Sequence, residues 1–136
     1  MDIQVYEDIL GGLVAYNNKL EENYGNDIVA TPTIDTTYPY TVFEEIRNTP
    51  LRSYNTCYDR VASIGYRVDV YAKNKGNITK QIIARRLAKE IDSYLTNNVG
   101  LTQVSWNISD LENDGSVYHI ITTYVADLHE NRRRIL

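Results

Sequence analysis

The chain has 136 residues, of which 43% are hydrophobic and 24% charged, a composition typical of one globular domain spanning residues 1–136. Its net charge of -4 gives no overall attraction to nucleic acid or to an anionic membrane, and no apolar run approaches the roughly 20 residues that a membrane-spanning helix needs. Because Cys57 is the only cysteine and the N-terminus lacks a signal-peptide pattern, we expect a cytoplasmic protein without an internal disulfide.

Tyrosine is unusually common, with twelve tyrosines against one phenylalanine and one tryptophan. Its side chain combines a large contact area with a polar tip, which suits surfaces that a partner partly covers. In the alternative interpretation, tyrosine simply replaces phenylalanine at the edges of the core.

The first predicted element is a helix over residues 2–24, because apolar residues recur at helical spacing on one side and charged residues occupy the other. Gly11 and Gly12 weaken its middle and fall on the polar side, where another backbone can approach closely. Gly25 and Asn26 are expected to end it. Residues 27–39, which contain two prolines, indicate an extended connector.

Two strands are predicted next, separated by a long loop. Residues 40–47 alternate in the manner of a strand, although neither face is uniformly apolar. Residues 48–60 have no regular period and contain several turn formers, and loops of this length often carry function. Residues 62–73 form the clearest strand, in which Arg67, Asp69 and Tyr71 line the face that we expect to be wet or to meet a partner.

A second helix is predicted over residues 78–97, with Asn77 as its N-cap. Its apolar arc is expected to face the core. Ile82 instead lies on the charged side, beside Arg86 and Lys89, and these three residues form a candidate interface.

The last two predicted strands, residues 101–112 and 116–128, flank Asn113-Asp114-Gly115, a sequence typical of a hairpin turn. The elements therefore follow the order α-β-β-α-β-β. We predict an α+β fold class, with an antiparallel four-stranded sheet and two helices packed on one face.

The sequence shows no motif for a nucleotide, a phosphate-binding loop or a zinc site. We interpret His119 and His129 as surface histidines near strand ends, and Cys57 as a free thiol on a loop rather than a nucleophile paired with His119. Neighbouring acids are interpreted as solvated surface. We therefore predict no catalytic residue, no cofactor and no metal, and a protein that is not an enzyme.

Charge is distributed unevenly along the chain. Residues 1–60 contain four basic and ten acidic residues, a net charge of -6, whereas the remaining residues carry +2. Such asymmetry can steer head-to-tail association, in which different surfaces of neighbouring copies meet and close into a ring. In one alternative interpretation, the second helix simply has a solvated charged face. In another, Arg85, Arg86, Lys89 and residues 132–134 form a nucleic-acid patch, but aromatic residues do not interleave with these cations.

A family resemblance rests on three stretches: GYRVDVYAKNKGNITKQIIARRLAKEIDSYL at 65–95, Leu-Thr-Gln-Val at 101–104 and NDGSVYHIITTYVADL at 113–128. Together they resemble the tail terminator family of long-tailed bacteriophages, whose members are also labelled tail completion or minor capsid proteins. That family has a Y-x-V-x-V-x-A strand entering an Ala- and Ile-rich helix, and a closing G-x-Y-H strand. The corresponding positions here are Tyr66, Val68, Val70, Ala72, Gly115, Tyr118 and His119, with two residues instead of one between Gly115 and Tyr118.

The resemblance covers most of the chain and is weakest at residues 27–60. It implies a homo-oligomeric ring, typically of six copies, that caps the tail tube, ends tube polymerisation and presents a docking surface to the head. The implied partners are the chain itself, the tail tube protein and the head–tail connector or neck protein, with no membrane and no specific nucleic acid. The implied location is the head-proximal end of the virion tail, after assembly in the host cytoplasm.

We expect the contacts of such a ring on one strand, one helix and one loop. The expected contact residues are Arg67, Asp69 and Tyr71; Ile82, Arg86 and Lys89; and Arg52, Tyr54 and Tyr58. Two other classes of function stay open, namely a head completion or neck protein of the head–tail interface and a small ligand-binding or enzymatic domain.

Overall fold

A computed structural model describes residues 6–31, 37–50, 61–109, 117–129 and 134–135. Its helices are α1 (Tyr6–Lys19), α2 (Lys80–Ser93) and the π-helical segment η1 (Tyr94–Val99). Its strands are β1 (Asp27–Val29), β2 (Tyr40–Pro50), β3 (Val61–Ala72), β4 (Thr102–Ser109), β5 (Tyr118–His129) and β6 (Arg134–Ile135).

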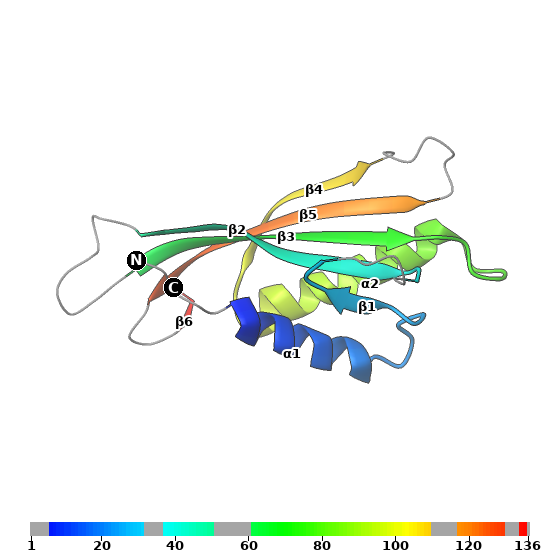
Figure 1. Ribbon diagram of the computed structural model, residues 1–136, viewed down its shortest axis with the longest axis horizontal. Coiled ribbons are helices and arrows are strands. Elements are labelled where there is room, and N and C mark those ends of the chain that lie inside the picture. The colour runs from blue at the N-terminus through cyan, green and yellow to red at the C-terminus, as the bar shows by residue number, and fades with distance from the viewer. Residues whose placement is uncertain (1–5, 32–36, 51–60, 110–116, 130–133, 136) are drawn as a thin grey trace.

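The strands form one mixed sheet in the order β1-β2-β3-β5-β4, and the two-residue β6 pairs with β5 (Figure 1). β1 runs parallel to β2, whereas the pairs β2–β3, β3–β5 and β4–β5 are antiparallel. The predicted antiparallel four-stranded sheet with the order α-β-β-α-β-β is therefore wrong. β1 was not predicted, because its three residues are too few to show the alternation of a strand within residues 27–39.

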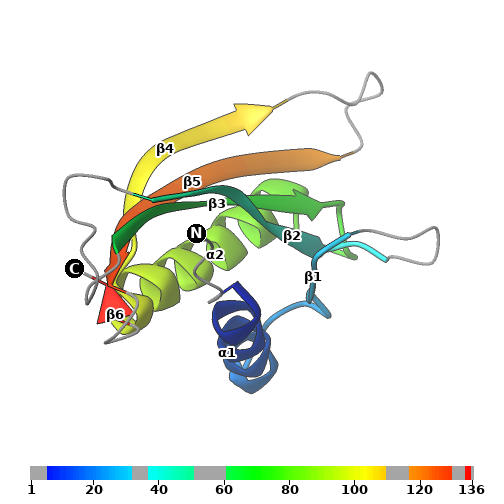
Figure 2. The same ribbon diagram turned by 60° about the vertical axis from the view of Figure 1, so that its left-hand side comes forward.

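α1 and α2 lie on the same face of the sheet, as Figure 2 shows from the side. The core fills the space between the two layers, and Tyr66 and Tyr124 are its largest fully buried side chains. α2 directs an apolar arc into this core, as its spacing predicts. The buried residues of α2 are Ile83, Ala84, Leu87, Ala88 and Ile91.

A buried polar network connects the end of α1 to the sheet. The Asn17 side chain donates to the Asn26 carbonyl at 2.7 Å, and the Asn26 side chain donates back to Asn17 Oδ1 at 3.0 Å. Thr41 of β2 donates to Asn26 Oδ1 at 3.0 Å. Because these buried groups bond to one another, the chain leaves the helix at Lys19, well before the predicted end at residue 24.

α2 is capped by Thr79, not by the predicted Asn77. The Thr79 hydroxyl accepts a hydrogen bond from the amide of Ile82 and so satisfies one of the free N–H groups of the first turn. η1 continues the chain to Gly100, whose left-handed backbone, with φ of 93°, turns it into β4. None of the described helices has the length and apolar character needed to cross a membrane.

Candidate functional site

The sheet face opposite the helices carries a row of stacked rings. Tyr40 of β2 lies opposite Tyr71 of β3, which in turn lies opposite His119 of β5. The Tyr40 and Tyr71 ring centres are 4.8 Å apart, and those of Tyr71 and His119 are 4.0 Å apart. Tyr38 extends the row beyond Tyr40 at 5.2 Å. The three tyrosines and His119 therefore pack across three strands and give this face a rigid row of rings.

Asp69 lies at the centre of a polar cluster beside this row. Its carboxylate accepts a hydrogen bond from Nε of Arg67 at 3.0 Å and lies 2.9 Å from Nε2 of His119. Asp69 and His119 are both buried, whereas the Arg67 side chain is 38% exposed. The expectation of a wet strand face is therefore wrong for Asp69, and the interpretation of His119 as a surface histidine is wrong as well.

Asp69 and His119 form a carboxylate–imidazole pair, a combination that enzymes use for proton transfer. A general base must reach the substrate proton, yet only 2% of His119 is accessible. Among the described residues, no group of three or more His, Cys, Asp or Glu side chains is placed to hold a metal ion. We therefore assign this cluster a structural role: it fixes the aromatic row.

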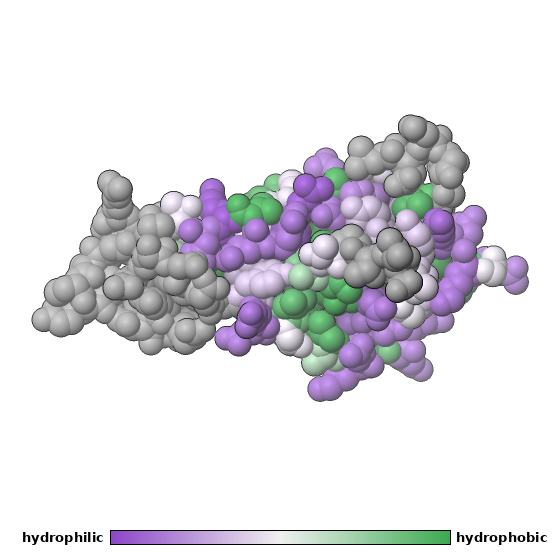
Figure 3. Space-filling model, viewed as in Figure 1, coloured by the Kyte–Doolittle hydropathy of each residue, from purple (hydrophilic) through white to green (hydrophobic). Residues whose placement is uncertain are grey.

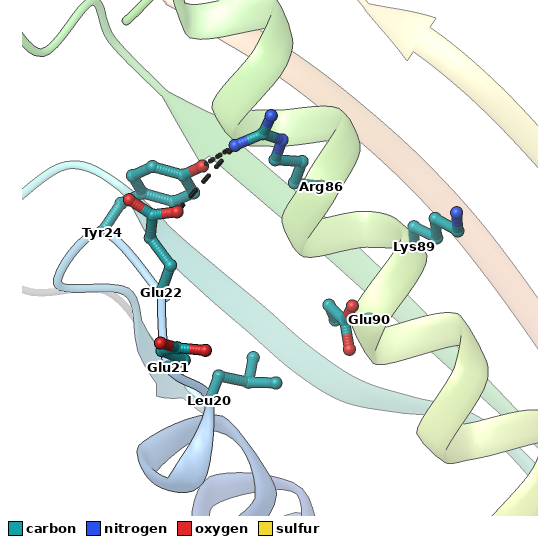
Figure 4. Close-up of a pocket in the computed structure, with 7 residues that line it drawn as sticks. All are labelled: Leu20, Glu21, Glu22, Tyr24, Arg86, Lys89 and Glu90. Atoms are coloured by element: carbon teal, nitrogen blue, oxygen red, sulfur yellow. Dashed lines mark hydrogen bonds and ion pairs between the residues drawn. The ribbon is translucent and has the colours of Figure 1, made fainter.

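The charged side of α2 borders a groove of about 390 Å³ against the end of α1 (Figure 4). Arg86 reaches across it, donating to the Tyr24 hydroxyl at 2.6 Å and lying 4.0 Å from Glu22. The hydrogen bond with Tyr24 raises the pKa of Arg86 above its ordinary value. On the neighbouring turn Tyr16 donates to Glu90 at 2.8 Å, a bond that raises the pKa of the Tyr16 hydroxyl. Arg86 thus joins α1 to α2, and Lys89 lines the same groove.

A second groove, of about 290 Å³, lies between α2 and β4. The Arg85 guanidinium lies 5.5 Å from the centre of the Trp106 ring, a cation–π arrangement. Deeper in the structure Tyr124 donates to Asp92 at 2.8 Å. This groove brings a cationic helix face next to an edge strand of the sheet.

That edge strand, β4, was missed as a candidate surface. Its residues Val104, Trp106 and Ile108 are among the most exposed large hydrophobic side chains of the described chain. On the face shown in Figure 3, hydrophobic residues gather in separate patches among hydrophilic ones. The sequence does contain a feature that indicates an interaction surface here, because Thr102–Ser109 includes the only tryptophan of the chain and no charged residue.

The expected contact residues thus have different surroundings. Arg67, Asp69 and Tyr71 share the helix-free face of β3, whereas the α2 residues lie on the opposite side of the sheet. Ile82 is 44% exposed, in agreement with its predicted place on the charged side of the helix, and its role at an interface stays a prediction. Arg52, Tyr54 and Tyr58 lie outside the described residues. The sequence matches no model of a known protein family, and no curated protein is significantly similar to it.

Proposed function

We propose that this chain is a structural virion protein that caps a phage tail tube as a homo-oligomeric ring, ends tube polymerisation and forms the docking surface for the head connector. The observation that carries the proposal is the resemblance of residues 65–95 to the strand-and-helix pattern of the tail terminator family. Those residues form most of β3, all of α2 and the start of η1, which together make the centre of the domain. Six copies is the number that the resemblance implies.

The surfaces of the domain support a role in assembly. Within the described residues, no helix covers one face of the sheet, and the stacked rings make that face rigid. β4 exposes large apolar side chains at the edge of the sheet. A capping ring needs rigid faces for its neighbours, for the tube and for the connector, and such faces change shape little on binding.

The proposal is tested by measuring the mass of the purified protein by light scattering, together with negative-stain imaging with and without tail tubes of the same phage. We expect closed rings, or protein bound at one end of each tube. Tubes polymerised in its presence are expected to stop growing at the capped end. A protein that stays monomeric and ignores the tubes would refute the proposal. Binding to the head connector but not to tubes would also refute it and indicate a neck protein.

A further inference from the structure

Among the described residues, the β4 edge of the sheet carries few of the features that normally prevent strands of different molecules from pairing. β4 is the last strand in the sheet order, and β5 is its only strand partner among the described residues. Natural edge strands are usually protected by charged residues, prolines, β-bulges or very short length. The eight residues of β4 include no charge and no proline, and the one irregularity in its pairing with β5 lies between Gln103 and Ser105.

The side chains of β4 are also unusually apolar for an exposed strand. Val104, Trp106 and Ile108 are 54%, 41% and 41% exposed. Trp106 and Ile108 lie opposite Thr122 and Ile120 of β5, so both point to the helix-bearing side of the sheet. A tryptophan in this setting is the kind of residue that dominates protein interfaces.

Over a comparable length, the opposite edge of the sheet has no strand partner among the described residues. β2 has eleven residues, and β1 pairs with only three of them, Tyr40, Thr41 and Val42, which leaves eight. Of these eight, Phe43 already accepts a hydrogen bond from the Tyr6 hydroxyl through its carbonyl. This outer part of β2, residues 43–50, contains a bulge at Ile46, whose side chain is 50% exposed. Glu44, Glu45 and Arg47 are exposed beside it, so this edge, unlike β4, carries charges that discourage pairing with a second copy of itself.

We propose that β4 of one copy pairs, antiparallel, with the outer part of β2 of the next copy, so that neighbouring subunits share a continuous sheet. The inference rests on the proposed function, since it names the contact that would join the copies of the ring. The strand directions allow it: β4 runs opposite to β5, which runs opposite to β3, which runs opposite to β2. A neighbour displaced along the sheet therefore presents its β2 antiparallel to β4.

The distribution of charge favours pairing of β4 with β2 of a neighbour over pairing of β4 with β4 of a neighbour. Arg85 and Lys89 of α2 line the groove next to Trp106 on the helix-bearing side. If two β4 strands paired around a two-fold axis, Arg85 and Lys89 of one subunit would approach Arg85 and Lys89 of the other, and the like charges would repel. Glu45 lies opposite the core residue Tyr66, and therefore on the helix-bearing side of β2. In the proposed contact Glu45 approaches the cations of the neighbour, which is electrostatically favourable.

Trp106 provides a direct readout, because it is the only tryptophan of the chain. Its emission and its quenching by acrylamide are followed over a dilution series of the purified protein while light scattering reports the mass. We expect a blue shift of the emission and reduced quenching at the concentrations where the mass rises. Rings that form without any change in Trp106 emission or quenching would overturn the proposed contact.

Three matched substitutions to glutamate test where the contact lies. Ile108→Glu places a negative charge on the β4 edge and is expected to weaken self-association at least about tenfold. Ala15→Glu introduces the same charge on the exposed side of α1 and is expected to leave the association unchanged. Ile82→Glu tests the charged side of α2. Dissociation caused by Ile82→Glu and not by Ile108→Glu would overturn the contact, and circular dichroism checks that each variant is folded.

A charge exchange tests the pairing of the two edges. Glu45→Lys and Lys89→Glu are each expected to weaken association, and the double variant is expected to recover most of the loss. If the double variant loses as much association free energy as the two single variants lose together, Glu45 and Lys89 do not meet.

The proposed contact and the proposed function can fail separately. Rings that include the β4 contact but do not bind tail tubes refute only the proposed function. Capped tubes with unchanged Trp106 emission and quenching refute only the proposed contact.

Discussion

Two buried tyrosines offer a matched test of how hydrogen bonding shapes the core. Tyr66 of β3 and Tyr124 of β5 lie directly opposite each other on the helix-bearing side, and neither has accessible surface. The Tyr124 hydroxyl donates to Asp92 at 2.8 Å. The Tyr66 hydroxyl has no hydrogen-bond partner in the described part of the chain. The same substitution, tyrosine to phenylalanine, should therefore change stability in opposite directions.

The magnitudes follow from these contacts. Tyr124→Phe removes a hydrogen bond to a carboxylate and is expected to lower the free energy of unfolding by about 1.5–3 kcal/mol. Tyr66→Phe removes a buried polar group that has lost its water without gaining a partner, so it is expected to raise the free energy of unfolding by about 1 kcal/mol. For a domain of this size, 1 kcal/mol corresponds to about 4 °C in Tm.

Urea denaturation followed by circular dichroism measures both variants against the unaltered protein, and thermal melts provide the Tm. Each variant serves as the control for the other, because burial, chemistry and strand position are matched. If Tyr66→Phe destabilises the protein as much as Tyr124→Phe does, the hydroxyl of Tyr66 has a partner or fills essential volume, and the reasoning is refuted.

Three further predictions concern the helices, the polar cluster and the pH dependence of stability. Gly11→Ala should raise Tm, because its new methyl meets open space and alanine favours the helix by about 1 kcal/mol, whereas Gly12→Ala should lower Tm because its methyl would overlap the Tyr94 hydroxyl. Asp69→Ala leaves the buried His119 ring without its carboxylate hydrogen-bond partner and should cost about 1.5–3 kcal/mol in urea unfolding, with Asp69→Asn costing less. Burial raises the pKa of the two core tyrosines, and the carboxylate bond adds to this in β5, so the folded state disfavours their ionisation. The contribution of these two tyrosines to the free energy of unfolding should therefore be constant below pH about 10 and fall above it. An alkaline titration followed by tyrosinate absorbance should show two tyrosines that ionise only as the protein unfolds.

Local periodicity predicted the central elements well. The alternation in residues 62–73 corresponds to β3, Val61–Ala72, and the helical spacing in 78–97 corresponds to α2 and η1. Both segments are long and keep one side uniformly apolar, because each packs one face against the same core. Segments with a weaker period were predicted less well: the first helix ends at Lys19 because the polar network of Asn17 and Asn26 redirects the chain.

The candidate contact residues show where local patterns stop being informative. Alternation correctly places Arg67, Asp69 and Tyr71 on one face of β3, but it does not reveal that Tyr71 stacks on His119 or that Asp69 is buried beside it. Those features depend on register with β5, a strand about fifty residues farther along the chain. The periodicity of one strand carries no information about the side chains that lie opposite it.

The sequence alone predicted the α+β composition, the two amphipathic helices and the long strands, because each is a property of neighbouring residues. Only the tertiary structure decided that the sheet is mixed, that β4 is its edge and that Trp106 is left exposed there. Strand order and edge exposure arise from pairing between distant segments, and short strands such as β1 and β6 form only because a longer strand is already present to bind them.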